Sequence, residues 1–156
     1  MENILASQVI AKLKERKLTI STAESLTGGL ISQKLTEVSG SSEVFQGSII
    51  AYSDEIKINV LGVEKQTILE FTSISEQVAL EMATNIRKIM KTGVGISTTG
   101  VAGPAKSAGF EPGLVFVAVA LDGHNMCQKL ELKGDREQIR AQTMDEVFRL
   151  ILSQLV

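Results

Sequence analysis

The sequence predicts an α/β fold, a three-layer α/β/α sandwich around a mixed, mostly parallel sheet. Segments with apolar residues at helical spacing alternate with short β-branched or apolar runs, an order typical of parallel strands joined by helices. Asp122-Gly123 separates two strand-like runs and adds one antiparallel hairpin. We expect a single domain over residues 1–156, because a chain of this length buries about 70% of its unfolded surface.

The first part of the chain predicts helix, strand and helix in turn. Residues 3–16 place Ile, Leu and Val at helical spacing between Lys and Glu, which predicts an amphipathic helix. Residues 18–22 are alternating and β-branched, as in a short strand. The turn over 23–29 leads into a second helix, and Gly40 is expected to end it.

The middle of the chain continues the alternation. Residues 46–52 predict a strand, and short helices are expected over 53–60 and 64–71. Ser75 is a good N-cap for a longer helix. The inward face of that helix is expected to hold Val78, Met82, Ile86 and Ile89. Residues 93–99 are continuously apolar enough to form a central strand.

The last third predicts a loop, the hairpin and a long helix. Residues 100–112 are rich in glycine, alanine and proline and should form a loop. Residues 114–121 and 125–132 are the two hairpin strands, and Asp135 caps the final helix. Its core face is expected to contain Ile139, Val147, Phe148, Ile151, Leu152 and Leu155.

Composition excludes several classes of function. The net charge is -2 without a basic stripe, so we expect no nucleic-acid partner. No apolar run approaches the roughly 20 residues of a membrane span, so we expect no membrane partner and a cytoplasmic location. One cysteine, Cys127, and one histidine, His124, do not make a zinc site. We expect no metal and no other cofactor.

The turn over residues 22–29 is the first candidate site. A strand ends there and a helix begins, which is where open α/β sheets bind ligands. Ser25 would stand at this junction as a nucleophile, and Gly28 and Gly29 would allow close approach to the backbone. The helix start would favour a phosphate or an oxyanion. The alternative is that Ser25 only caps the helix and the glycines only serve packing.

Three further candidates lie at other strand and helix ends. Lys57 falls about one turn into the helix after Tyr52, and a buried lysine can act as the base for a serine. The loop over 98–104 could complete an anion or oxyanion pocket. Arg140 shares a largely apolar face with Met144 and should point at something anionic. The alternatives are a solvated lysine, a packed strand-end tyrosine, a plain turn and an arginine that reaches water.

Histidine chemistry is a poor fit to this chain. His124 is the only histidine and lies in the hairpin turn, so a Ser-His-Asp triad is not expected. If Ser25 is a nucleophile, its base must therefore be another group, and lysine is the natural choice.

Several motifs follow one another along nearly the whole chain: Thr-Ala-Glu-Ser-Leu-Thr-Gly-Gly at 22–29, Gly-Ser-Ser at 40–42, Tyr-Ser-Asp-Glu-Ile-Lys at 52–57, Leu-Gly-Val at 61–63, Thr-Gly-Val-Ala-Gly-Pro at 99–104 and Gly-Asp-Arg at 134–136. In order and spacing they resemble the CinA C-terminal domain family. The resemblance implies a three-layer fold, frequent dimers, and an amidohydrolase that converts nicotinamide mononucleotide to nicotinate mononucleotide and ammonia in pyridine nucleotide salvage. It implies a homodimer whose ligand is a pyridine nucleotide.

The resemblance also implies roles for individual residues. Ser25 matches the nucleophile, Lys57 the base and Tyr52 an assisting tyrosine. The positions expected to bind substrate, including the helix start discussed above, are Thr27, Gly28, Gly29, Thr99, Gly100, Val101, Ala102, Gly103 and Arg140.

One segment departs from the family pattern. Residues 105–113 lack the usual paired glycines, and Glu111 stands where a lysine is usual. If this loop shapes the nucleotide pocket, substrate choice could differ. Two alternatives therefore stay open: a nucleotide-binding module with weakened turnover, and a protein-interaction module.

Overall fold

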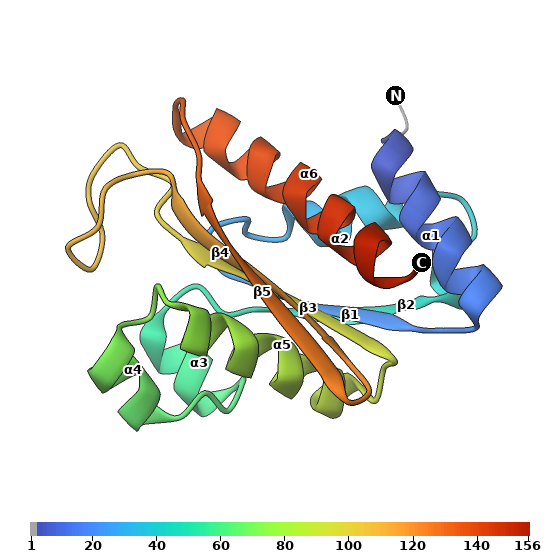
Figure 1. Cartoon of the computed structure of the whole chain (residues 1–156), viewed down its shortest axis with the longest axis horizontal. Coiled ribbons are helices and arrows are strands. Elements are labelled where there is room, and N and C mark those ends of the chain that lie inside the picture. Colours follow the sequence, from blue (N-terminus) through green and yellow to red (C-terminus); the bar gives the residue numbers. More distant parts are fainter. Residues whose placement is uncertain (1–2) are drawn as a thin grey trace.

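The computed structural model describes residues 3–156 and contains one five-stranded sheet between two helical layers (Figure 1). Residues 1–2 of the expected domain lie outside the described residues. The strands are β1 (Ile20–Glu24), β2 (Phe45–Ile50), β3 (Val94–Gly100), β4 (Leu114–Leu121) and β5 (His124–Glu131). The helices are α1 (Ile4–Arg16), α2 (Leu30–Thr36), α3 (Asp54–Asn59), α4 (Lys65–Phe71), α5 (Glu76–Met90) and α6 (Arg136–Gln154).

The sheet has the order β2-β1-β3-β4-β5. β1 pairs in parallel with β2 and β3, whereas β3–β4 and β4–β5 are antiparallel. The predicted three-layer fold and mixed sheet are confirmed. The prediction of a mostly parallel sheet is also confirmed, because β1, β2, β3 and β5 run in one direction and β4, which is antiparallel to both β3 and β5, runs in the other.

Helices cover both faces of the sheet. α1, α2 and α6 lie on one face, and α3, α4 and α5 lie on the other (Figure 1). Phe148 and Ile20 belong to the large core under α6 and α1. α5 contacts all five strands, and small side chains such as Ala83 and Ala118 form the core between it and β4. Every residue of β1 is buried, as a strand covered on both faces requires.

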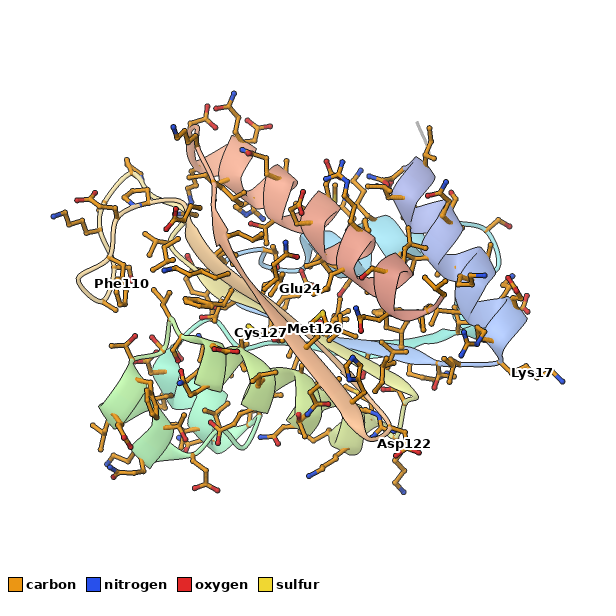
Figure 2. All side chains as sticks on the ribbon, viewed as in Figure 1. Lys17, Glu24, Phe110, Asp122, Met126 and Cys127 are labelled. Carbon is orange, nitrogen blue, oxygen red and sulfur yellow. The ribbon has the colours of Figure 1, made fainter. Side chains whose placement is uncertain are left out.

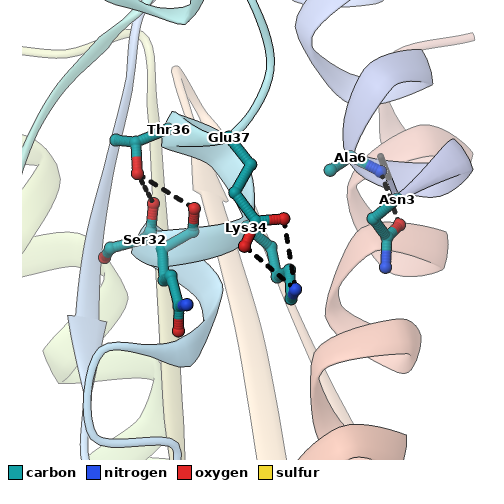
Figure 3. Close-up of polar contacts among 7 residues, drawn as sticks. Asn3, Ala6, Ser32, Lys34, Thr36 and Glu37 are labelled. Carbon is teal, nitrogen blue, oxygen red and sulfur yellow. Dashed lines mark hydrogen bonds and ion pairs between the residues drawn. The ribbon is translucent and has the colours of Figure 1, made fainter. Parts of the chain in front are cut away.

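Helix caps explain why the helices start where the sequence predicts. Asn3 Oδ1 accepts from the Ala6 N–H at 3.0 Å at the start of α1 (Figure 3). Ser75 caps α5 and Asp135 forms a capping box at the start of α6. In α2, the Thr36 hydroxyl donates to the Ser32 carbonyl at 3.0 Å, so a side chain satisfies one of the last carbonyls (Figure 3).

Strand ends and one helix face differ from the predictions. β1 is Ile20–Glu24 rather than 18–22, because its parallel pairing with β3 continues to Glu24 and Thr98. β2 is Phe45–Ile50 rather than 46–52. The prediction that Ile89 faces inward is wrong: it is 47% exposed, because Ile86 and Met90 take the core-facing positions in this part of α5.

Two further properties bear on function. No helix within residues 3–156 is both long enough and apolar enough to cross a membrane. Cys127 is a residue of β5 (Figure 2) and packs against the core between α5 and β4. Burial raises the pKa of its thiol to about 12. At neutral pH this thiol therefore stays protonated and is a weak nucleophile.

Candidate active site

A pocket of about 290 Å³ opens at the carboxyl ends of the parallel strands. The loops that follow β1, β2 and β3 meet there, as the topology of such sheets dictates. Residues from these loops, from the α4–α5 connection and from the helices α3 and α6 form its walls: Ser25, Tyr52, Asp54, Lys57, Ser73, Ile74, Thr99, Gly100, Val101, Ala102, Gly103, Pro104, Ala105, Ser107 and Arg136.

Ser25 follows β1 directly and contributes a hydroxyl to this pocket. Its N–H donates to the Thr98 carbonyl at 3.1 Å and lies 3.2 Å from the Thr98 hydroxyl oxygen. These contacts tie the residue to the end of β3. The side chain is only 7% exposed, so its hydroxyl faces the pocket rather than bulk water.

Lys57 lies in α3 and reaches the same point from the neighbouring loop. Its Nζ donates to Ser25 Oγ at 3.0 Å and to the Ala51 carbonyl at 2.9 Å. The residue is 2% exposed. Burial lowers the pKa of Lys57, and the nearby Asp54 carboxylate partly opposes this effect. A neutral amine at this distance from a hydroxyl can accept its proton.

The local fold explains why Lys57 points inward. Ser53 caps α3 by accepting from the Ile56 N–H at 3.2 Å, which starts the helix directly after β2. The Ala51 N–H donates to the Glu24 carbonyl at 2.9 Å and holds this short connection against β1. Lys57 is consequently one turn from the strand end, close enough to reach Ser25.

Tyr52, Arg136 and Gly103 connect three segments at the pocket mouth. Arg136 donates from Nη2 to the Tyr52 hydroxyl at 2.9 Å and from Nη1 to the Gly103 carbonyl at 2.7 Å. Tyr52 is 60% exposed, so its ring is at the entrance. Guanidinium has five N–H donors, and these two bonds leave others for a ligand.

Comparisons with known proteins identify the family. Residues 2–155 match the model of the CinA C-terminal domain. The chain belongs to the CinA C-terminal domain family. It is 46% identical over 140 residues to a CinA-like protein of Kosmotoga olearia, a match that covers 89% of this chain and 34% of that protein. A second relative, a protein from Thermoanaerobacter pseudethanolicus, is 44% identical over 156 residues. That match covers 99% of this chain and 38% of the relative.

Solved CinA-family structures have the same fold. A competence or damage-inducible protein from Enterobacter asburiae has a TM-score of 0.95 at 31% identity, covering 97% of this chain and 96% of that one. A CinA superfamily protein from Escherichia coli has a TM-score of 0.94 at 28% identity, covering 100% and 91%. The chain thus spans well under half of the curated relatives named above but nearly all of these structures.

The structure of this CinA domain places Arg140 outside the pocket walls. Its Nε donates to the Leu26 carbonyl at 3.0 Å and its Nη2 donates to the Thr27 carbonyl at 2.9 Å. The expected anionic partner is thus not among its contacts, because both of its acceptors are neutral backbone carbonyls. Arg136, one turn earlier on α6, is the arginine that lines the pocket. The Gly-Asp-Arg motif, together with the Asp135 cap, was the sequence signal for it.

The start of α2 is not free to bind an anion. Glu24 is fully buried, and its carboxylate accepts from the N–H groups of Gly29, Ile31 and Ser32 at 3.0–3.2 Å. Thr27 donates its hydroxyl to the same carboxylate at 2.7 Å. Thr27, Gly28 and Gly29 therefore lie beside the pocket rather than in its walls. Sequence reasoning did not single out Glu24 as a capping residue.

The loop after β3 contributes the predicted residues from Thr99 to Gly103 to the pocket. Val101 is fixed on both sides: its N–H donates to the Leu114 carbonyl at 2.9 Å, and its carbonyl accepts from Gly113 at 2.8 Å. Within the described part of the chain, the N–H groups of Ala102 and Gly103 have no protein acceptor. Gly28, by contrast, donates to the Ser25 carbonyl. Ala102 and Gly103 therefore have N–H groups available for an oxyanion, whereas Gly28 does not.

Ligands for a metal are not clustered in this domain. Among residues 3–156, no group of three or more His, Cys, Asp or Glu side chains is arranged to hold an ion. His124 lies on β5 and bonds Gln154 at 2.8 Å, away from the residues that line the pocket.

Proposed function

We propose that this CinA domain is an amidohydrolase that removes the carboxamide nitrogen of nicotinamide mononucleotide, giving nicotinate mononucleotide and ammonia in pyridine nucleotide salvage. The observation that carries the proposal is the buried contact of 3.0 Å between Lys57 Nζ and Ser25 Oγ. A depressed amine pKa beside a serine is the arrangement that Ser-Lys hydrolases need.

Acylation begins at Ser25. Neutral Lys57 accepts the hydroxyl proton while Oγ attacks the carboxamide carbon. The tetrahedral intermediate then breaks its C–N bond, and the nitrogen leaves as ammonia after taking the proton back from Lys57. Tyr52, at the pocket entrance, assists this proton transfer. Water attacks the resulting ester, Lys57 takes its proton and returns it to Ser25 Oγ, and the carboxylate product is released.

The oxyanion would be held by backbone donors. Ala102 and Gly103 line the pocket together with Ser25, and their N–H groups have no protein acceptor within residues 3–156. One such donor typically lowers the barrier by about 3–4 kcal/mol.

The substrate phosphate would bind Arg136. Glu24 occupies the N–H groups of α2, and Arg140 is engaged by two carbonyls, so Arg136 is the cationic side chain in the pocket walls other than the buried Lys57. Asp54 is in the same walls, and its carboxylate suits the positively charged pyridinium ring. The reaction uses no metal or cofactor, and we propose a cytoplasmic homodimer without nucleic-acid or membrane partners.

The test is ammonia release from nicotinamide mononucleotide by wild-type protein and by two pairs of variants. Ser25→Ala and Lys57→Met should each lower kcat by at least about a thousandfold, because each removes one partner of the acylation step. Ser42→Ala and Lys88→Met, which change exposed residues, are the matched controls and should keep the wild-type rate.

Two outcomes would contradict the proposal. Turnover by Ser25→Ala would show that Ser25 is not the nucleophile. A loss of only a few-fold in the rate of Lys57→Met would show that Lys57 is not the base. Binding of the nucleotide by wild-type protein without ammonia release would instead support a nucleotide-binding module. The observation that favours this second candidate is that Ala105 and Ser107, which belong to the segment that departs from the family pattern, line the pocket.

A further inference from the structure

Glu24 is a buried carboxylate that immediately precedes Ser25. It is 0% exposed, and no basic side chain of residues 3–156 forms an ion pair with it. Burying a carboxylate is costly unless hydrogen bonds compensate the charge. Figure 2 shows Glu24 between the sheet and the helical layer of α2 and α6, so it faces away from Lys57 and the α3 layer.

The carboxylate has a full set of donors. Oε1 accepts from the Thr27 hydroxyl at 2.7 Å, the Ile31 N–H at 3.0 Å and the Gly29 N–H at 3.2 Å. Oε2 accepts from the Ser32 N–H at 3.1 Å and from the Ser32 hydroxyl at 2.5 Å. Charge-assisted bonds of this kind are stronger than neutral ones. They hold the turn over residues 25–29 from one side, while Arg140 holds its carbonyls from the other.

One branch of this network leads back to the nucleophile. Thr27 Oγ1 lies 2.9 Å from Thr98 Oγ1, and Thr98 Oγ1 accepts from the Ser25 N–H at 3.2 Å. An ionised carboxylate only accepts, so Thr27 must donate to Glu24. Having one proton, the Thr27 hydroxyl must then accept from Thr98. The proton of Thr98 is thereby directed away from Ser25, and its lone pair is directed toward the Ser25 N–H.

We infer that Glu24 is a positioning residue for Ser25: acting through the hydroxyls of Thr27 and Thr98, its carboxylate fixes the backbone that holds Ser25 Oγ 3.0 Å from Lys57 Nζ. This inference rests on the proposed function in taking Ser25 as the nucleophile. It does not depend on which amide is the substrate. Consecutive residues of a strand point to opposite faces, so Glu24 acts without touching the reacting atoms.

Comparing Thr27→Val with Ser32→Ala distinguishes a role of Glu24 in positioning Ser25 from a role only in stabilising the start of α2. Each removes one hydroxyl that donates to Glu24, but only Thr27 leads to Ser25. The readout is the rate at which a fluorophosphonate labels Ser25, followed by mass spectrometry. In that reaction Oγ attacks phosphorus, fluoride leaves, and Lys57 takes the hydroxyl proton, so no natural substrate is needed.

Thr27→Val and Glu24→Gln should label between about 10- and 100-fold more slowly than wild type, as small displacements of a reacting group produce. Ser32→Ala should stay within about twofold even where its loss of melting temperature equals that of Thr27→Val. Thr27→Ser, which restores the hydroxyl, should recover the rate. The pH at which labelling is half-maximal should not change, because burial, the main cause of the lowered pKa of Lys57, is unaltered by these substitutions.

Other results would overturn the inference. They are wild-type labelling by Thr27→Val, equal slowing by Ser32→Ala, or a failure of Thr27→Ser to recover the rate. If labelling follows the predicted order but nicotinamide mononucleotide releases no ammonia, the substrate proposal fails and the positioning role stands. If wild-type Ser25 does not label, crystal structures decide: a Ser25–Lys57 separation that lengthens in Thr27→Val supports the role, and an unchanged separation rejects it.

Discussion

Lys57 has two properties that rarely occur together in a lysine. It is 2% exposed, and its amine has only a hydroxyl and a carbonyl as hydrogen-bond partners. Neither partner carries a charge, so nothing in direct contact compensates an ammonium ion. The neutral form is favoured for this reason, and a general base must be neutral to act.

Asp54 gives a direct test of this electrostatic balance. Its carboxylate raises the pKa of Lys57 against the larger effect of burial. Asp54→Asn removes that opposition, so the pKa of Lys57 should fall further and the amine should stay neutral at lower pH. The acidic limb of the kcat/KM profile should therefore move to lower pH. Glu55→Gln, on the same turn, is the control. A limb that stays in place, or moves to higher pH, would show that Lys57 is not the group that titrates.

The sequence predicted some residues of the pocket and not others, and the difference has a physical reason. Ser25, Tyr52 and Lys57 were predicted from motifs, and the structure brings all three to one pocket. Their catalytic roles stay predictions. Arg136 and Arg140 are one turn apart on the same face of α6, and which of them reaches the pocket depends on how far along the helix axis the pocket lies. Glu24 could not be predicted to be buried, because its donors come from a turn whose shape periodicity does not reveal.

At the scale of elements, local signals predicted the helices well. Asp135 with Gln138 makes a capping box, and its effect is local enough to read from sequence. Strand ends are set by pairing with distant strands, so β1 and β2 differ from their predicted bounds by up to two residues. The prediction for Ile89 was wrong because periodicity does not fix the exact rotation of the helix: Ile86 and Met90 pack into the core, and Ile89 does not.

The contact between β3 and α5 should depend on one glycine. A Cβ added at Gly95 would meet the Ala83 carbonyl and lie 2.7 Å from Arg87 Cβ, both fixed parts of α5. Gly95→Ala should lower the free energy of unfolding by about 1–3 kcal/mol through overpacking. Gly47→Ala is the matched control, because its Cβ would meet only the flexible end of Met90 at 3.4 Å.

Urea denaturation measures the free energy of unfolding of Gly95→Ala and Gly47→Ala. Gly47→Ala should change the free energy of unfolding by less than about 1 kcal/mol. If Gly95→Ala is as stable as wild type, then α5 can move away from β3 without cost, and the close helix–sheet packing does not stabilise the fold.

At the scale of the whole molecule, the same buried amine should lower stability. The unfolded chain keeps Lys57 protonated up to its ordinary pKa of 10.5, whereas the folded protein releases that proton at lower pH. Between these two pKa values the unfolded state binds more protons, so the free energy of unfolding rises with pH. Below both pKa values the amine of Lys57 is charged in the folded and the unfolded protein. Folding must then bury that charge, so the loss of stability is largest. An active-site group that lowers stability in this way is a common feature of enzymes.

Lys57→Met removes the titrating amine. The difference in stability between wild type and this variant therefore measures how Lys57 contributes to the free energy of unfolding at each pH. The variant also loses the bond to the Ala51 carbonyl, but that loss does not vary with pH. The stability of wild type relative to Lys57→Met should therefore increase with pH through the window below 10.5 and level off above it, by about 1.4 kcal/mol for each unit that separates the two pKa values. Urea denaturation at several pH values measures the difference, with the exposed Lys88→Met as the control that should show no such trend. A constant difference between wild type and Lys57→Met would mean that Lys57 is as easily charged in the folded protein as in water, and the amine could then not serve Ser25 as a base near neutral pH.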